Sequence, residues 1–217
     1  MHDKLKTFKA YKSNHRLICY FSWEQRARTF GARTEGVKNK DYRIKKSLLL
    51  VPKIFALKKL IIMKEHQILI DELLHLLNGG NAHADLDRAL KGLPADLRGA
   101  KPDKLPYSIW QLVEHIRIAQ WDMLEFSKDG SHESPNWPDD YWPKETAPQN
   151  DDAWEKSVKQ IELDRDELAG LIKNGDLYSK IPHGDGQTIL REALQVADHN
   201  AYHVAEIIVI RRLLGAW

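Results

Sequence analysis

Hydrophobic residues recur with a helical period from about residue 63 to the end of this chain. Leu69, Leu73, Leu76 and Leu77 follow this spacing, and the residues Asn-Gly-Gly at 78–80 predict where that helix ends. Glycine favours such an end because it accepts the left-handed backbone conformation of a helix C-terminus. A short helix is predicted next, over residues 84–91.

Three longer segments complete the helical pattern. One begins at Ser108, which stands in capping-box spacing with Gln111, and continues to about Ser127. Another covers residues 151–173 and ends at an Asn-Gly pair, and Thr188 is expected to cap the last helix. Residues 128–150, rich in proline and aromatic residues, predict a loop packed on the helices, with a lid over a site as the sharper interpretation. No segment has a strand period, so the fold class is all-α, a helical bundle.

Charge divides the chain into two parts. Residues 1–62 hold 16 Lys and Arg against 4 Asp and Glu, whereas residues 63–217 hold 17 against 27. The sequence therefore predicts a basic N-terminal extension, residues 1–62, and a helical domain, residues 63–217. The extension either is poorly structured, lies upstream of the true start at Met63, or binds an acidic partner such as nucleic acid or a membrane surface. The acidic charge of the domain makes nucleic-acid binding there an unfavoured interpretation.

A single cysteine, Cys19, excludes an intrachain disulfide and favours a reducing compartment, the cytoplasm. The most apolar run, residues 47–62, contains Pro52 and three lysines. It is too short and too charged for a transmembrane segment.

Histidines are the candidate chemistry. His199 and His203 interrupt the apolar stripe of the last helix, and His115 lies on or beside the buried face of the helix that follows Ser108. Three imidazoles from two helices predict an open site for Zn²⁺, Ni²⁺ or Fe²⁺. The alternative is a hydrogen-bonded polar layer in the core, because a buried imidazole needs some partner.

Four further residues are candidates to orient or extend this site. Asp122 and Glu206 follow a histidine ligand by one or two turns, and Asp198 directly precedes His199. Each can accept the second N–H of a ligating imidazole. His83 lies in a loop, where it is a candidate proton shuttle. No catalytic residue is assigned.

Two segments resemble the DinB-like superfamily of metal-dependent enzymes: residues 107–126 (YSIWQLVEHIRIAQWDMLEF) and residues 184–217, with their HNAYH and RRLLG motifs. The resemblance covers about residues 63–217. It implies a four-helix bundle of up-down-down-up type, with a metal held at His115, His199 and His203. It also implies a metal-dependent activity on a small molecule, such as transfer to or from a low-molecular-weight thiol.

Two functions compete for the helical domain, beside nucleic-acid binding by the basic extension. The first is a metal-dependent enzyme, a thiol-dependent S-transferase or a hydrolase. The second is a non-catalytic helical bundle that forms a homodimer or binds a partner.

Overall fold

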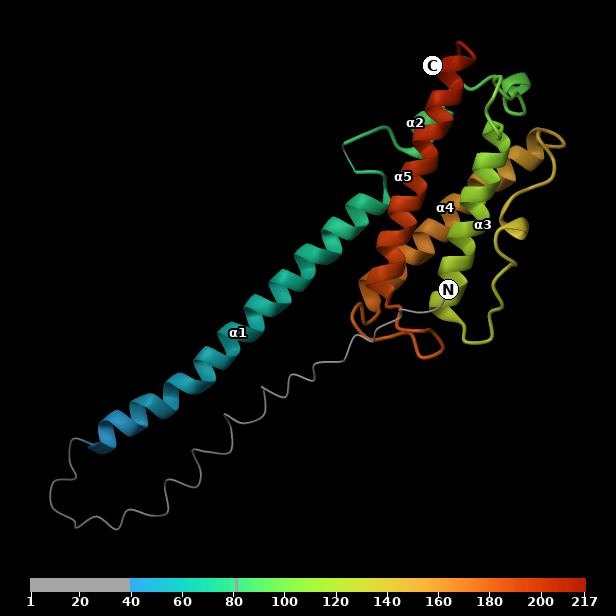
Figure 1. The fold of residues 1–217 in the computed structure, drawn as a ribbon. Helices are drawn as coiled ribbons and strands as arrows, with labels where there is room; N and C mark the ends of the chain where they lie inside the picture. Colours follow the sequence, from blue (N-terminus) through green and yellow to red (C-terminus); the bar gives the residue numbers. More distant parts are fainter. Residues whose placement is uncertain (1–39, 81) are drawn as a thin grey trace, which may run out of the picture. The chain divides into compact units, whose positions relative to one another are not determined.

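The computed structural model describes residues 40–80 and 82–217, with side chains from residue 51 onward. The chain divides into two compact units, residues 1–58 and residues 59–217. Within the described residues there are five α-helices and no β-strand (Figure 1). The all-α fold class is therefore confirmed.

The first helix, α1, covers Lys40–Leu77. It begins well before residue 63, so residues 40–62 are helical rather than irregular. Lysine, leucine and isoleucine make up most of this stretch, and lysine and leucine are strong helix formers. Residues 1–39, which include Cys19, lie outside the described residues, and their irregular structure stays a prediction. None of the described helices is long and apolar enough to cross a membrane.

Among the α1 side chains that the structure describes, burial begins only near the C-terminal end of the helix. The side chains of residues 51–65 are all exposed, whereas Ile70, Leu73 and Leu77 are 5–7% exposed. These three residues join a core cluster with side chains from α3, α4 and α5, such as Leu124, Leu168 and Val196. The last turns of α1 are therefore the part that packs on the other helices.

Four helices follow α1. These are α2 (Leu86–Leu90), α3 (Ile109–Lys128), α4 (Asp151–Asn174) and α5 (Ile189–Leu213). Their N-terminal caps explain where they begin, because each cap accepts a backbone N–H that has no partner inside the helix. Ser108 forms the predicted capping box with Gln111 at the start of α3. Thr188 caps α5 as predicted, and Asn150 caps α4.

Three long helices form the body of the 59–217 unit. In Figure 1, α3 and α4 run in the same direction and α5 runs in the opposite direction, as the last three helices of an up-down-down-up bundle do. Buried Ile109, Leu112 and Ile116 of α3 pack with Trp154 of α4 and Ile207 of α5 in a second core cluster. Hence α3 and α5 lie side by side, and the face between them carries the histidines.

Candidate metal centre

The three predicted histidines come together between α3 and α5. His115 of α3 is 2% exposed and His203 of α5 is 6% exposed, while His199 is partly exposed. His199 and His203 are four residues apart, so α5 presents them from successive turns on one side. Because His199 is partly exposed, the cluster is not sealed from solvent.

The ring nitrogens of the cluster converge. One nitrogen of each histidine lies within 4.8 Å of the others, and the Nε2 atoms of His115 and His199 are 3.1 Å apart. Two imidazole nitrogens at this separation can share one divalent ion, since Zn–N bonds are about 2.0–2.1 Å long. This is the only such group of potential ligands found among the described residues.

Hydrogen bonds at the Nδ1 atoms of His115 and His203 fix the tautomers of these two rings. The Nδ1–H of His115 donates to the carbonyl oxygen of Tyr141 at 2.8 Å, because a carbonyl can only accept. The Nδ1–H of His203 donates to Oε2 of Glu206 at 2.7 Å. A neutral imidazole with a proton on Nδ1 has a lone pair on Nε2. Both rings therefore direct a metal-binding lone pair into the cluster.

A chain of amides does the same for His199. The carbonyl of Ile161 accepts from Nε2 of Gln120 at 2.7 Å, so Oε1 of Gln120 must be the atom that accepts from Nδ2 of Asn200, at 2.8 Å. This leaves Oδ1 of Asn200 toward Nδ1 of His199, at 3.4 Å. The network thus favours a proton on Nδ1 of His199 as well, although this last contact is long.

Burial keeps the cluster neutral. It lowers the pKa of His199 and of His203 to about 4, and in each case a neighbouring imidazole adds to the shift. Burial also lowers the pKa of His115, against the hydrogen bond to Tyr141. A neutral imidazole is the form that binds a metal ion, so His199 and His203 stay competent for ligation well below pH 6.

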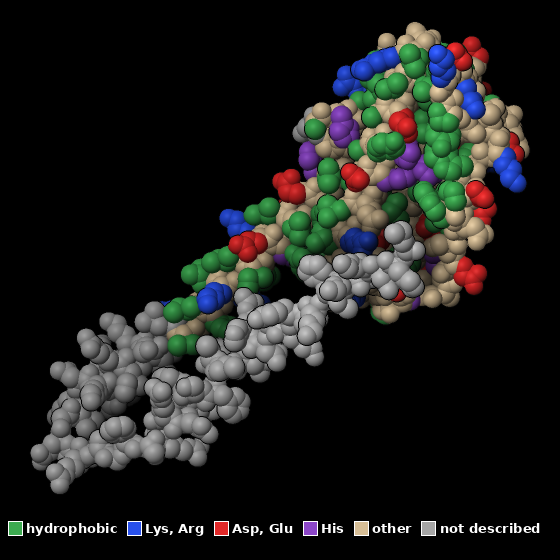
Figure 2. Space-filling view, in the orientation of Figure 1, with side chains coloured by type: hydrophobic (Ala, Val, Ile, Leu, Met, Phe, Trp, Pro, Cys, Tyr) green, Lys and Arg blue, Asp and Glu red, His purple; other side chains and the backbone are tan. Residues whose placement is uncertain are grey.

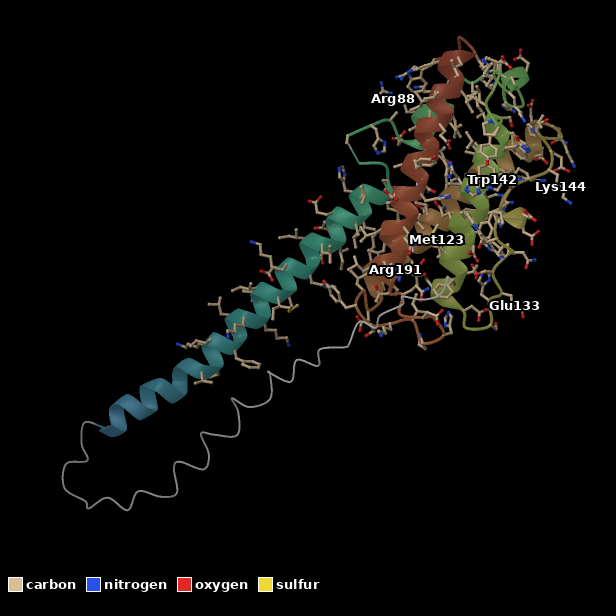
Figure 3. All side chains as sticks on the ribbon, viewed as in Figure 1. Arg88, Met123, Glu133, Trp142, Lys144 and Arg191 are labelled. Carbon is tan, nitrogen blue, oxygen red and sulfur yellow. The ribbon has the colours of Figure 1, made fainter. Side chains whose placement is uncertain are left out.

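An aromatic stack covers His115. The ring of Trp142 lies parallel to His115 at 3.8 Å between centroids, and Tyr107 stacks on the other face of Trp142 at 3.9 Å. Figure 3 shows Trp142 against α3. Tyr141 is buried, so the predicted packing of the 128–150 loop on the helices is confirmed for Tyr141 and Trp142, whereas Trp137 is 72% exposed.

The four candidate orienting residues lie in different places. Glu206 hydrogen-bonds His203. Asp122 does not contact the cluster: it accepts the hydroxyl of Tyr141 at 2.5 Å and pairs with Nε2 of His132 at 2.8 Å. Asp122 is connected to the cluster through Tyr141, because the carbonyl of Tyr141 accepts the hydrogen bond from His115. Asp198 is exposed on α5, and His83 is exposed with its ring nitrogen 2.9 Å from the carbonyl of Ala84.

Comparison with known proteins agrees with this geometry. The family profile of the DinB superfamily matches residues 80–207. The chain belongs to the DinB superfamily. Members of the DinB superfamily often bind metal. No curated protein and no solved structure matches the chain.

Several residues around this DinB-superfamily site have no signal of their own in the sequence. Gln120 and Asn200 are polar residues in apolar helices, and only their meeting across α3 and α5 reveals a role. The carbonyl of Tyr141 is a backbone group, so the residue type at this position gives no indication of its role. Trp142 belongs to an aromatic-rich loop, and that composition is the one signal that pointed toward the site.

The donor set fits a divalent metal of borderline softness. Three neutral imidazoles suit Zn²⁺, Ni²⁺ or Fe²⁺, and three protein ligands leave a position for another ligand. The 3.1 Å contact between His115 and His199 also suits a hydrogen bond if His199 carries its proton on Nε2. A metal-bound cluster and a cluster held by a hydrogen bond between His115 and His199 differ in metal content, which an experiment can measure.

Proposed function

We propose that this protein is a metal-dependent enzyme that acts on a small molecule, with His115, His199 and His203 as the metal ligands. The observation that carries the proposal is the convergence of the three imidazoles, with an acceptor beside the Nδ1 atom of each ring. Such ligand orientation by outer hydrogen bonds is common in metalloproteins.

The reaction classes that suit this site are thiol-dependent S-transfer and hydrolysis. A divalent metal held there would supply Lewis acidity, which lowers the pKa of a water or thiol ligand. The protein's own residues orient the site: Glu206 fixes the tautomer of His203, and Tyr141 fixes that of His115. Trp142 and Tyr107 exclude water from one face of His115, which favours electrostatic interactions inside the site.

Metal content of the purified full-length protein tests the proposal. We expect close to one equivalent of Zn, Ni or Fe per chain. The His203→Ala variant is expected to lose this metal, because only two imidazole ligands remain. His83→Ala is the matched control, since it removes an exposed imidazole that does not contact the cluster. A wild-type protein that takes up no metal from added Zn²⁺, or a His203→Ala variant with full metal content, contradicts the proposal.

The second candidate is a non-catalytic helical bundle that pairs with a second copy or binds a partner. The observation that favours it is the large number of exposed apolar side chains on α1, such as Phe55, Leu60 and Met63, which are 60–70% exposed. Light scattering after size-exclusion chromatography distinguishes a monomer from a homodimer. A metal-free dimer with the histidines sealed from solvent would favour this second function.

A further inference from the structure

An apolar groove adjoins the histidine cluster. It has a volume of about 260 Å³ and lies between the 105–107 segment, the N-terminal half of α3 and the C-terminal half of α5. Its walls include Tyr107, Leu112, Tyr202, Glu206, Val209 and Ile210. Figure 2 shows hydrophobic side chains gathered beside histidine atoms on this face. Binding sites for small molecules are typically about 300–1,000 Å³, so the groove suits a small ligand.

Side chains that line the groove also contact the histidine cluster or the aromatic stack on it. Glu206 lines the groove and accepts the hydrogen bond from His203. The ring of Tyr202, which is 64% exposed, lies 4.9 Å from the ring of His203. On the other side, Tyr107 lines the groove and stacks on Trp142, which stacks on His115. A molecule in the groove is therefore separated from His203 by Glu206 and Tyr202, and from His115 by Tyr107 and Trp142.

Charge decides which molecules fit. Glu206 is the only charged side chain that lines the groove, and one of its oxygens already accepts from His203. Its other oxygen accepts no hydrogen bond from any residue that the structure describes. An anionic ligand would meet this carboxylate in a groove that no Lys or Arg lines, whereas an ammonium group would pair with it. The excess of 27 acidic over 17 basic residues in residues 63–217 acts in the same direction.

We propose that the groove binds the apolar part of a small amine, with the ammonium group beside Glu206. This proposal rests on the proposed function in that it names the substrate class of the same site. The apolar walls provide the favourable burial, and the carboxylate provides the orientation, which is how small-molecule sites divide these tasks.

Three probes with the same ring test the charge preference: benzylamine, benzyl alcohol and benzoate. Binding is measured by calorimetry and ligand-observed NMR on full-length protein treated with a chelator, so that benzoate cannot ligate a metal. We expect benzylamine to bind at least ten-fold more tightly than benzoate, with benzyl alcohol between them. Equal binding of the three probes, or a preference for benzoate, overturns the proposal.

Two variants of one residue locate the binding. Val209 is 47% exposed, so α5 accepts a larger side chain there. Val209→Trp fills the groove and is expected to weaken benzylamine binding at least ten-fold, while Val209→Lys adds a cation and is expected to shift the preference toward benzoate. Leu213→Trp is the control, because Leu213 is exposed on α5 and does not line the groove. Unchanged binding in both Val209 variants overturns the assignment.

Metal content separates the two proposals. Val209→Trp and Val209→Lys leave the three histidines in place, so both are expected to keep the wild-type metal content. Benzylamine binding in a protein that takes up no metal would reject the metalloenzyme and keep the groove. Full metal content with no preference for benzylamine would reject the amine site and keep the metalloenzyme.

Discussion

At the scale of single residues, the cluster depends on side chains that never touch the proposed metal. Gln120 is fully buried between α3, α4 and α5, where it donates to Ile161 and accepts from Asn200. Asn200 in turn faces His199. Because the carbonyl of Ile161 can only accept, it sets the orientation of both amides and places an acceptor, Oδ1 of Asn200, toward Nδ1 of His199.

Gln120→Leu tests this chain of amides. The variant keeps the approximate volume but removes the acceptor that orients Asn200. We expect the affinity for Zn²⁺ to fall about ten-fold or more, the range found when outer hydrogen bonds to ligating histidines are lost. Competition with a chromophoric chelator measures the affinity, and an unchanged dissociation constant in a folded variant argues against the role of Gln120.

The pH dependence of metal binding also belongs to this scale. An ordinary histidine has a pKa near 6.5, and protons then compete with the metal below that pH. In the folded protein the pKa of His199 and of His203 is lowered to about 4, so their neutral form persists as pH falls from 6.5 toward 4. We expect Zn²⁺ affinity to change little between pH 7 and pH 5.5 and to fall steeply only near pH 4. A steep loss between pH 7 and pH 6 in chelator competition would contradict the lowered pKa values.

At the scale of elements, Tyr141 fastens the loop of residues 129–150 to α3 through two hydrogen bonds. The hydroxyl of Tyr141 donates to Asp122, which also pairs with His132. The carbonyl of Tyr141 accepts from His115. One loop residue thus connects a buried carboxylate of α3 with a histidine of the cluster.

Tyr141→Phe removes the first of these two attachments and keeps the second. A hydrogen bond to a charged group contributes about 1.5–3 kcal/mol, so we expect the free energy of unfolding in urea to fall by about that amount. Trp137→Phe is the control in the same loop, because Trp137 is 72% exposed, and it is expected to leave stability nearly unchanged. Equal stability of the two variants would mean that the hydrogen bond between Tyr141 and Asp122 does not stabilise the fold.

At the scale of the whole molecule, burial defines where the helical domain begins. Every side chain from residue 51 to residue 65 is exposed, and Ile70 is the first buried position among the α1 side chains that the structure describes. Removing residues 1–62 therefore removes none of the described core. We propose that residues 63–217 are an independent domain.

A chain that starts at Met63 tests the domain boundary. We expect it to fold, to melt within a few degrees of the full-length protein and to bind the same amount of Zn²⁺, because both core clusters and the three histidines are retained. Circular dichroism with temperature and metal analysis provide the measurements. Aggregation or a large loss of melting temperature would show that the first 62 residues contribute to the fold.

The sequence by itself determined the helices and the three histidines. Period-3.6 stripes, the caps at Ser108 and Thr188 and the stop at residues 78–80 are local signals, and local hydrogen bonding and burial of one face are enough to fix them. Because His199 and His203 interrupt an apolar stripe, their place on the inner face of the last helix could also be predicted. The helix over residues 40–62 was not predicted, because its apolar residues do not gather on one face of the helix.

Only the tertiary structure decided how the histidines are oriented. Gln120 meets Asn200 across two helices, and the carbonyl of Tyr141 reaches His115 from a loop 26 residues away. The place of Asp122, one contact removed from the cluster, depends on the same packing. Sequence spacing predicts which side chains share a helix face, but hydrogen bonds between elements depend on how those faces dock, and docking is a property of the whole fold.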